Sequence, residues 1–169
     1  MNKFISALLV ALVGLVIVNI VATVGVMKKV DKILPTDTAS KTIENPLPES
    51  ITKDVVGDIF TQFEKAFNSH DFDTFYGLFS PFAQSQMKRE ELVKTYSQLI
   101  DYFDEVSNGV FSHYEFNGQQ GNMKAYNLNY IVDLGEESKF GGKGKARITI
   151  TWDGKEYGIV STFISSYNY

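Results

Sequence analysis

The chain has 169 residues, a formal net charge of −4 at pH 7 and no cysteine. The missing cysteines exclude disulfides and thiolate metal sites, so no metal and no cofactor is expected. Nucleic acid is not expected as a partner either, because neutralising phosphates needs clustered Lys and Arg, and this acidic chain has no such cluster beyond residue 32.

Residues 4–27 form an apolar run without a charged side chain, and three lysines follow it at positions 28, 29 and 32. With a rise of about 1.5 Å per residue, the run makes a helix of about 36 Å, enough to cross a hydrocarbon core of about 30 Å. The sequence therefore predicts a single-pass membrane anchor over residues 1–29, in contact with the bilayer through residues 4–27. A cleaved signal peptide is the alternative, although its apolar region is usually shorter and ends in a small-residue cleavage site.

Small residues recur along one side of this anchor and predict a face on which another membrane helix packs closely. Asn19 adds a polar side chain to that face, which consists of Ala7, Ala11, Gly14, Asn19, Ala22 and Gly25. The lysines after the run favour a cytoplasmic domain, but long domains translocate largely regardless of such charges. We expect a cell-membrane protein whose folded domain is extracytoplasmic.

Residues 30–50 contain most of the prolines and few residues able to form a core, which predicts a linker. The remaining residues, 51–169, have the usual size of one domain. Their apolar residues first recur at helical spacing, which predicts three helices over about 51–68, 72–79 and 89–106. The second of these begins after Asp71, a typical N-cap residue, and stops at Pro81.

After residue 109 the apolar residues alternate, which is typical of half-buried strands. Four strands are predicted, over about 110–116, 126–134, 146–152 and 157–165, with a tight turn at Asp153-Gly154 before the last. The fold class is therefore α+β, with three helices packed on a curved antiparallel sheet of about four strands.

Residues 63–81, FEKAFNSHDFDTFYGLFSP, and the continuation MKREELV at 87–93 resemble the helical opening of nuclear-transport-factor-2-like domains of the cystatin-like superfamily. The soluble part, residues 51–169, is similar to small bacterial envelope members of unknown function. The resemblance implies a cone-shaped domain. It leaves function open, because known members include isomerases and dehydratases as well as non-catalytic binding and assembly proteins.

Residue types that carry catalysis are sparse. His70 falls in a predicted turn and His113 on the first predicted strand, so they do not form a local metal pair. Asp71 and Asp73 fit the start of a helix, where carboxylates accept backbone N–H bonds. Ketosteroid-isomerase-like members of the superfamily use a pocket tyrosine with buried acids, and the possible tyrosines here are Tyr76, Tyr96, Tyr126 and Tyr130. No acidic residue falls on the inward face of the predicted strands, and Asp133 is on the polar register, so no catalytic residue is assigned.

Aromatic residues are abundant enough to line a ligand cavity between helices and sheet or simply to fill the core. The predicted pocket consists of Phe60, Phe63, Tyr96, Tyr130 and Trp152. We expect a membrane-anchored, non-catalytic binding or assembly module of a bacterial envelope, with a protein partner or second copy bound through the sheet face or the anchor helix. The alternatives are a subunit of a membrane complex that uses the anchor for contacts, and a small-molecule isomerase or dehydratase with a pocket in the cone.

Overall fold

The computed structural model describes residues 45–166. The predicted anchor, its helix-contact face and most of the predicted linker lie outside these residues. Within residues 45–166, no helix is both long and apolar enough to cross a membrane.

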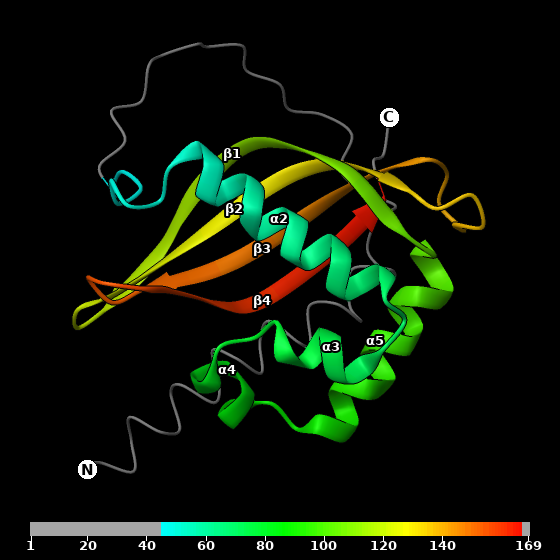
Figure 1. Ribbon diagram of the computed structural model, residues 1–169, viewed down its shortest axis with the longest axis horizontal. Helices are drawn as coiled ribbons and strands as arrows, with labels where there is room; N and C mark the ends of the chain where they lie inside the picture. The colour runs from blue at the N-terminus through cyan, green and yellow to red at the C-terminus, as the bar shows by residue number, and fades with distance from the viewer. Residues whose placement is uncertain (1–44, 167–169) are drawn as a thin grey trace, which may run out of the picture. The chain divides into compact units, whose positions relative to one another are not determined.

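The domain is an α+β fold in which four helices precede four antiparallel strands (Figure 1). The helices are α2 (Lys53–Asn68), α3 (Phe72–Gly77), α4 (Pro81–Gln86) and α5 (Arg89–Phe103). The strands β1 (Val106–Gln120), β2 (Met123–Leu134), β3 (Lys143–Trp152) and β4 (Tyr157–Ser166) pair in chain order in one curved sheet. Helix α2 crosses the sheet, and α4 lies beside β4, where the Ser80 N–H donates to Ile159 O at 2.8 Å.

The predicted number of helices is wrong by one within the described residues. The additional helix is α4, which begins at Pro81, where the sequence predicted only the end of a helix. Proline fits the first turn of a helix because the backbone N–H that it lacks would have no helical partner there. The Ser80 hydroxyl caps α4 by accepting a bond from the Ala83 N–H at 3.3 Å.

The first strand begins earlier and ends later than predicted. Helix α5 ends at Phe103 because Asp104 has a φ of 61°, a left-handed conformation that stops the helix. Val106 is therefore the first residue of β1 and not the last of a helix. The strand continues to Gln120, with register shifts that break its alternation.

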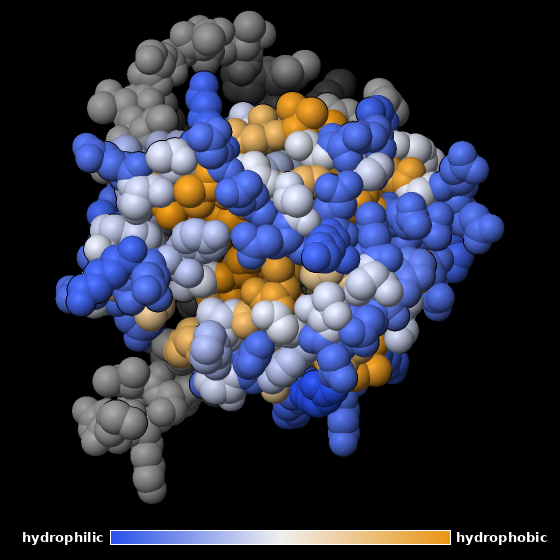
Figure 2. All heavy atoms as spheres, in the orientation of Figure 1, coloured by the Kyte–Doolittle hydropathy of each residue, from blue (hydrophilic) through white to orange (hydrophobic). Residues whose placement is uncertain are grey.

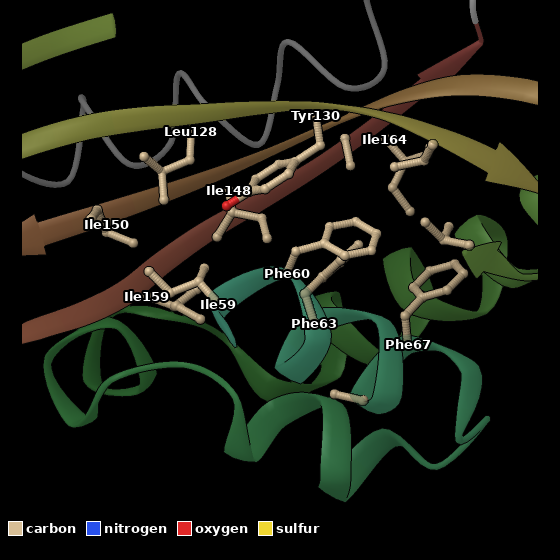
Figure 3. Packing of buried hydrophobic residues seen from close by; sticks show 14 of the residues in the cluster. Ile59, Phe60, Phe63, Phe67, Leu128, Tyr130, Ile148, Ile150, Ile159 and Ile164 are labelled. Carbon is tan, nitrogen blue, oxygen red and sulfur yellow. The ribbon is translucent and has the colours of Figure 1, made fainter. Parts of the chain in front are cut away.

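The core lies between α2 and the covered face of the sheet. Ile59, Phe63 and Phe67 of α2 are fully buried and face apolar side chains of β2, β3 and β4 (Figure 3). Aromatic rings continue this packing, with the Phe60 and Tyr130 centroids 5.1 Å apart and the Phe75 and Tyr96 centroids 4.5 Å apart. Within residues 45–166, no polar or charged residue is buried.

Candidate functional site

A groove of about 830 Å³ runs between α2 and the start of β1. Its volume falls within the range of small-molecule sites in proteins. In Figure 2, hydrophilic side chains follow α2, and apolar surface shows on the β1 side. The groove is lined by Lys53, Asp54, Gly57, Asp58, Phe60, Thr61, Glu64, Asn108, Gly109 and Val110.

Two contacts hold the helix and the strand that form this groove. The Asn68 side chain donates to Val106 O at 2.9 Å and accepts from the Val106 N–H at 3.0 Å, which joins the end of α2 to the start of β1. Gly109 lies against the Phe60 ring so closely that an added Cβ would meet ring carbons at 2.3 Å. Gly57, in contrast, faces open space, so the groove is wide beside it.

The charges in the groove are mainly negative. Asp54 and Asp58 are exposed, whereas Glu64 is partly buried where α2 approaches β1. No residue of the described part forms an ion pair or side-chain hydrogen bond with these three carboxylates. Lys53, the first residue of α2, supplies a positive charge. The groove therefore favours neutral or cationic ligands over anions.

The other polar groups of the groove already have partners. Thr61 donates its hydroxyl proton to Gly57 O at 3.1 Å, and the Asn108 amide donates to Asp133 at 3.0 Å. Bonds from Lys143 and Asn108 hold the pKa of the Asp133 carboxyl below its usual value. Asp133 is therefore an ionised structural partner of Asn108 and Lys143 and not an acid for catalysis.

The four tyrosines predicted as possible proton donors are all engaged by the backbone. Each hydroxyl donates to a backbone carbonyl: Tyr76 to Gln84 O at 3.3 Å, and Tyr96 to Phe67 O at 3.0 Å. In the same way, Tyr126 donates to Pro46 O at 3.1 Å and Tyr130 to Val56 O at 2.9 Å. Burial raises the pKa of the Tyr96, Tyr126 and Tyr130 hydroxyls above the ordinary value. Such phenols hold segments together and are not poised to give up a proton at neutral pH.

The five residues predicted to line one ligand pocket lie in different surroundings, and the pocket itself stays a prediction. Phe63, Tyr96 and Tyr130 are buried in the core. Phe60 forms part of the floor of the α2–β1 groove, although it is itself buried. Trp152 lies by a second, separate hollow of about 350 Å³.

The histidines are exposed and apart. His70 occupies the turn before α3 with a φ of 52°, and the Asp71 carboxylate caps that helix, as predicted, by accepting bonds from the Asp73 and Thr74 N–H groups. His113 points to the sheet face opposite the core, where its Nε2 lies 3.7 Å from a Glu115 oxygen. Within residues 45–166, no three carboxylate or imidazole side chains gather closely enough to hold a metal ion.

The residues that sequence reasoning missed are the groove carboxylates, above all Glu64. Gly57, Phe60 and Glu64 recur at intervals of three and four, so they fall on one stripe of α2. That stripe was visible in the sequence, but nothing local indicated that a strand more than 40 residues later would pack beside it.

No protein-family model matches the chain, and no curated protein matches it either. Among solved structures, the chain is similar to a putative aromatic ring hydroxylase from Novosphingobium aromaticivorans, with 10% identity, 66% of this chain and 85% of that chain covered, and a TM-score of 0.40. It is also similar to a putative dehydratase of the NTF2-like family from Streptomyces avermitilis, with 15% identity, 70% of this chain and 100% of that chain covered, and a TM-score of 0.42.

These comparisons correct one prediction from the sequence. Both structures are described as putative enzymes, and this finding contradicts the predicted non-catalytic binding or assembly module, which is therefore not retained. The second structure is named for the family that the sequence resembles. At these identities and TM-scores, the likeness does not decide what reaction this chain performs.

Proposed function

We propose that the domain is a small-molecule enzyme of the isomerase or dehydratase type, and that its site is the groove between α2 and β1. The observation that carries this proposal is Glu64, a partly buried carboxylate without a partner among the described residues, in a hollow large enough for a small molecule. An unpaired carboxylate at a partly dry position is free to accept a proton from a bound compound.

The groove also suggests which compounds would bind. Asp54 and Asp58 lie about 15 Å and 9 Å from Glu64 along the helix, judged from the rise per residue. Their charges repel anions and attract an amine or hydroxyl groups. Val110, which is 66% exposed, offers apolar surface to the remainder of the molecule. The substrate class is therefore a neutral or amine-bearing carbonyl compound with a short apolar part.

Glu64 can serve both reaction types as a single acid–base group. Its carboxylate takes a proton from the carbon next to the carbonyl, the electron pair of that C–H bond forms a C=C bond to the carbonyl carbon, and the C=O pair moves to the oxygen to give an enolate. In the isomerisation of a β,γ-unsaturated compound, the carbonyl re-forms, the double bond shifts to the α,β position, and the same carboxyl returns the proton to the γ-carbon. In a dehydration, the carbonyl re-forms as a Cα=Cβ bond forms and the C–O bond at the β-carbon breaks, and the carboxyl gives its proton to the departing hydroxyl, so water leaves.

The test follows hydrogen exchange at carbon, which reports proton abstraction before the natural substrate is known. The full-length protein is incubated in D2O with a panel of neutral and amine-bearing ketones and β-hydroxy ketones, and NMR measures the loss of the C–H signals. We expect catalysed exchange of at least one of these compounds. The Glu64→Gln variant should lose about 10²–10⁴-fold of that rate, the usual contribution of a general base.

Glu90→Gln is the matched control, because Glu90 is exposed on α5 and does not line the groove. It should exchange at the wild-type rate, and both variants should unfold within about 0.5 kcal/mol of the wild type. Equal exchange by the wild type and Glu64→Gln would refute the proposal, as would a panel in which the wild type catalyses no exchange.

We also infer that the domain is of the nuclear-transport-factor-2-like type found in bacterial envelopes and that residues 4–27 tether it to the cell membrane. The sequence supports this through the uncharged apolar run and the proline-bearing segment behind it. The full-length chain should stay with the membrane after alkaline extraction, and a chain that begins at residue 30 should not. A reporter fused after Tyr169 should be active only outside the cytosol.

A further inference from the structure

Asparagine is followed by glycine at two places in the chain, Asn108-Gly109 and Asn117-Gly118. Both pairs lie in β1, the strand at one edge of the sheet. Asparagine is a thermally labile residue, and a following glycine, which has no Cβ, leaves its side-chain amide open to attack by the next backbone nitrogen. The surroundings of the two pairs differ, so their reactivity should differ as well.

Asn117 occupies the more open of these two places. It is exposed and falls at a register shift, because Phe116 and Gly118 have partners in β2 and Asn117 has none. Within residues 45–166, its side chain has no hydrogen-bond partner. Gly118 has a φ of 133°, and a Cβ added there would meet no atom within 4 Å. The Asn117 side chain and the Gly118 nitrogen therefore have room to approach each other.

The first pair, in contrast, is held from two sides. Asn108 and Gly109 also lack register partners, but the Asn108 Nδ2 donates to the ionised Asp133 carboxylate at 3.0 Å. Gly109 lies against the Phe60 ring, where an added Cβ would meet ring carbons at 2.3 Å. Breaking a hydrogen bond to an ionised acceptor slows a step that requires it by about ten- to a hundredfold.

We propose that Asn117 is a site of spontaneous deamidation in the folded protein and that the fold protects Asn108. The Gly118 nitrogen gives its proton to hydroxide and attacks Cγ of Asn117. The Cγ–Nδ2 bond breaks, and the leaving nitrogen takes a proton from water and departs as ammonia, so a five-membered succinimide ring remains. Water then adds to one of the two ring carbonyls, and the C–N bond to that carbonyl breaks. The product is aspartate or isoaspartate, depending on which bond breaks.

Either product places a carboxylate where a neutral amide was, so β1 gains one negative charge. In isoaspartate the backbone also passes through Cγ and is longer by one methylene group. The modification is independent of the proposed reaction at Glu64, because neither Asn117 nor Gly118 lines the α2–β1 groove.

The test follows the full-length protein in mild detergent at pH 7 and at pH 9, beside an equal sample unfolded in urea. Chymotrypsin cleaves after Tyr114 and Phe116 and so separates the two asparagines, and mass spectrometry of the fragments measures the converted fraction at each. In the folded protein, Asn117 should convert about ten- to a hundredfold faster than Asn108. Conversion should be faster at pH 9, because the attacking nitrogen must lose its proton. In urea the two sites should convert at similar rates, because the contacts that protect Asn108 are lost.

Asn117→Gln and Asn108→Gln are the matched variants, because glutamine would have to close a six-membered ring and reacts more slowly. Ion-exchange chromatography of the aged wild type should show a more acidic form that persists in Asn108→Gln and is missing from Asn117→Gln. Asn117→Gln should unfold at the denaturant concentration of the wild type, since the exposed side chain has no partner to lose. The proposal is overturned if Asn108 converts as fast as Asn117 in the folded protein, or if Asn117 stays intact there.

Discussion

The two sides of α2 differ sharply although they belong to one helix. On the side that faces the sheet, Phe63 and Phe67 are 0% exposed and every neighbouring tyrosine hydroxyl has a backbone acceptor. On the side that faces the groove, Asp54, Asp58 and Glu64 have no partner in the described part of the chain. The covered side is apolar and fully packed, whereas the groove side carries carboxylates that are unpaired within the described residues.

Removing a ring from the covered side should cause the largest loss. Phe63→Ala leaves a cavity at a fully buried position, so we expect the free energy of unfolding to fall by about 3–5 kcal/mol. Chemical denaturation of the wild type and the variant measures this change. Thr61→Ala, two residues away on the groove side, should cost less than about 1 kcal/mol. Similar losses in the two variants would remove the distinction between the sides of α2.

Alanine substitutions at two glycines of the groove should change the stability of the fold in opposite directions. Gly109→Ala forces a Cβ into the Phe60 ring, so we expect a loss of about 1–3 kcal/mol from overpacking. Gly57→Ala adds a methyl group in open space within a helix and should raise stability by about 0.5–1 kcal/mol. Thermal denaturation of both variants checks the signs. A stabilising Gly109→Ala would mean that β1 does not approach Phe60 as described.

The smallest effect concerns the tyrosine bonds under the sheet, and it depends on pH. Tyr130→Phe removes the bond to Val56 O and should cost about 1 kcal/mol at pH 7. Burial raises the pKa of Tyr130 in the folded state, so the neutral phenol stabilises the fold fully below the unfolded pKa of about 10. That contribution is lost as the pH rises above 10 towards the folded pKa.

Denaturation at pH 7 to 11.5 tests this prediction, and the difference between wild type and Tyr130→Phe cancels the titration of other groups. The difference should stay constant up to about pH 10 and shrink above it. A difference that grows above pH 10 would contradict a raised pKa for Tyr130.

Much of the fold followed from local patterns in the sequence. The spacing of Ile59, Phe63 and Phe67 predicted α2, the alternation after residue 122 predicted β2 to β4, and Asp71 predicted the start of α3. These features were accessible because a helical stripe, an alternating strand and an N-cap depend on residues a few positions apart. The predicted partners, the sheet-face contact and the membrane location stay predictions. They depend on other molecules or on residues outside 45–166.

The sequence by itself determined the class of the domain, its aromatic core and the positions of most helices and strands, because each of these is specified by neighbouring residues. Only the tertiary structure decided which distant segments meet. It buried Phe63, Tyr96 and Tyr130 in the core, bonded the tyrosine hydroxyls to backbone carbonyls, and brought β1 beside Glu64. Such juxtapositions depend on how closely segments 40 or more residues apart approach, and the close contact of Gly109 with Phe60 sets that approach here.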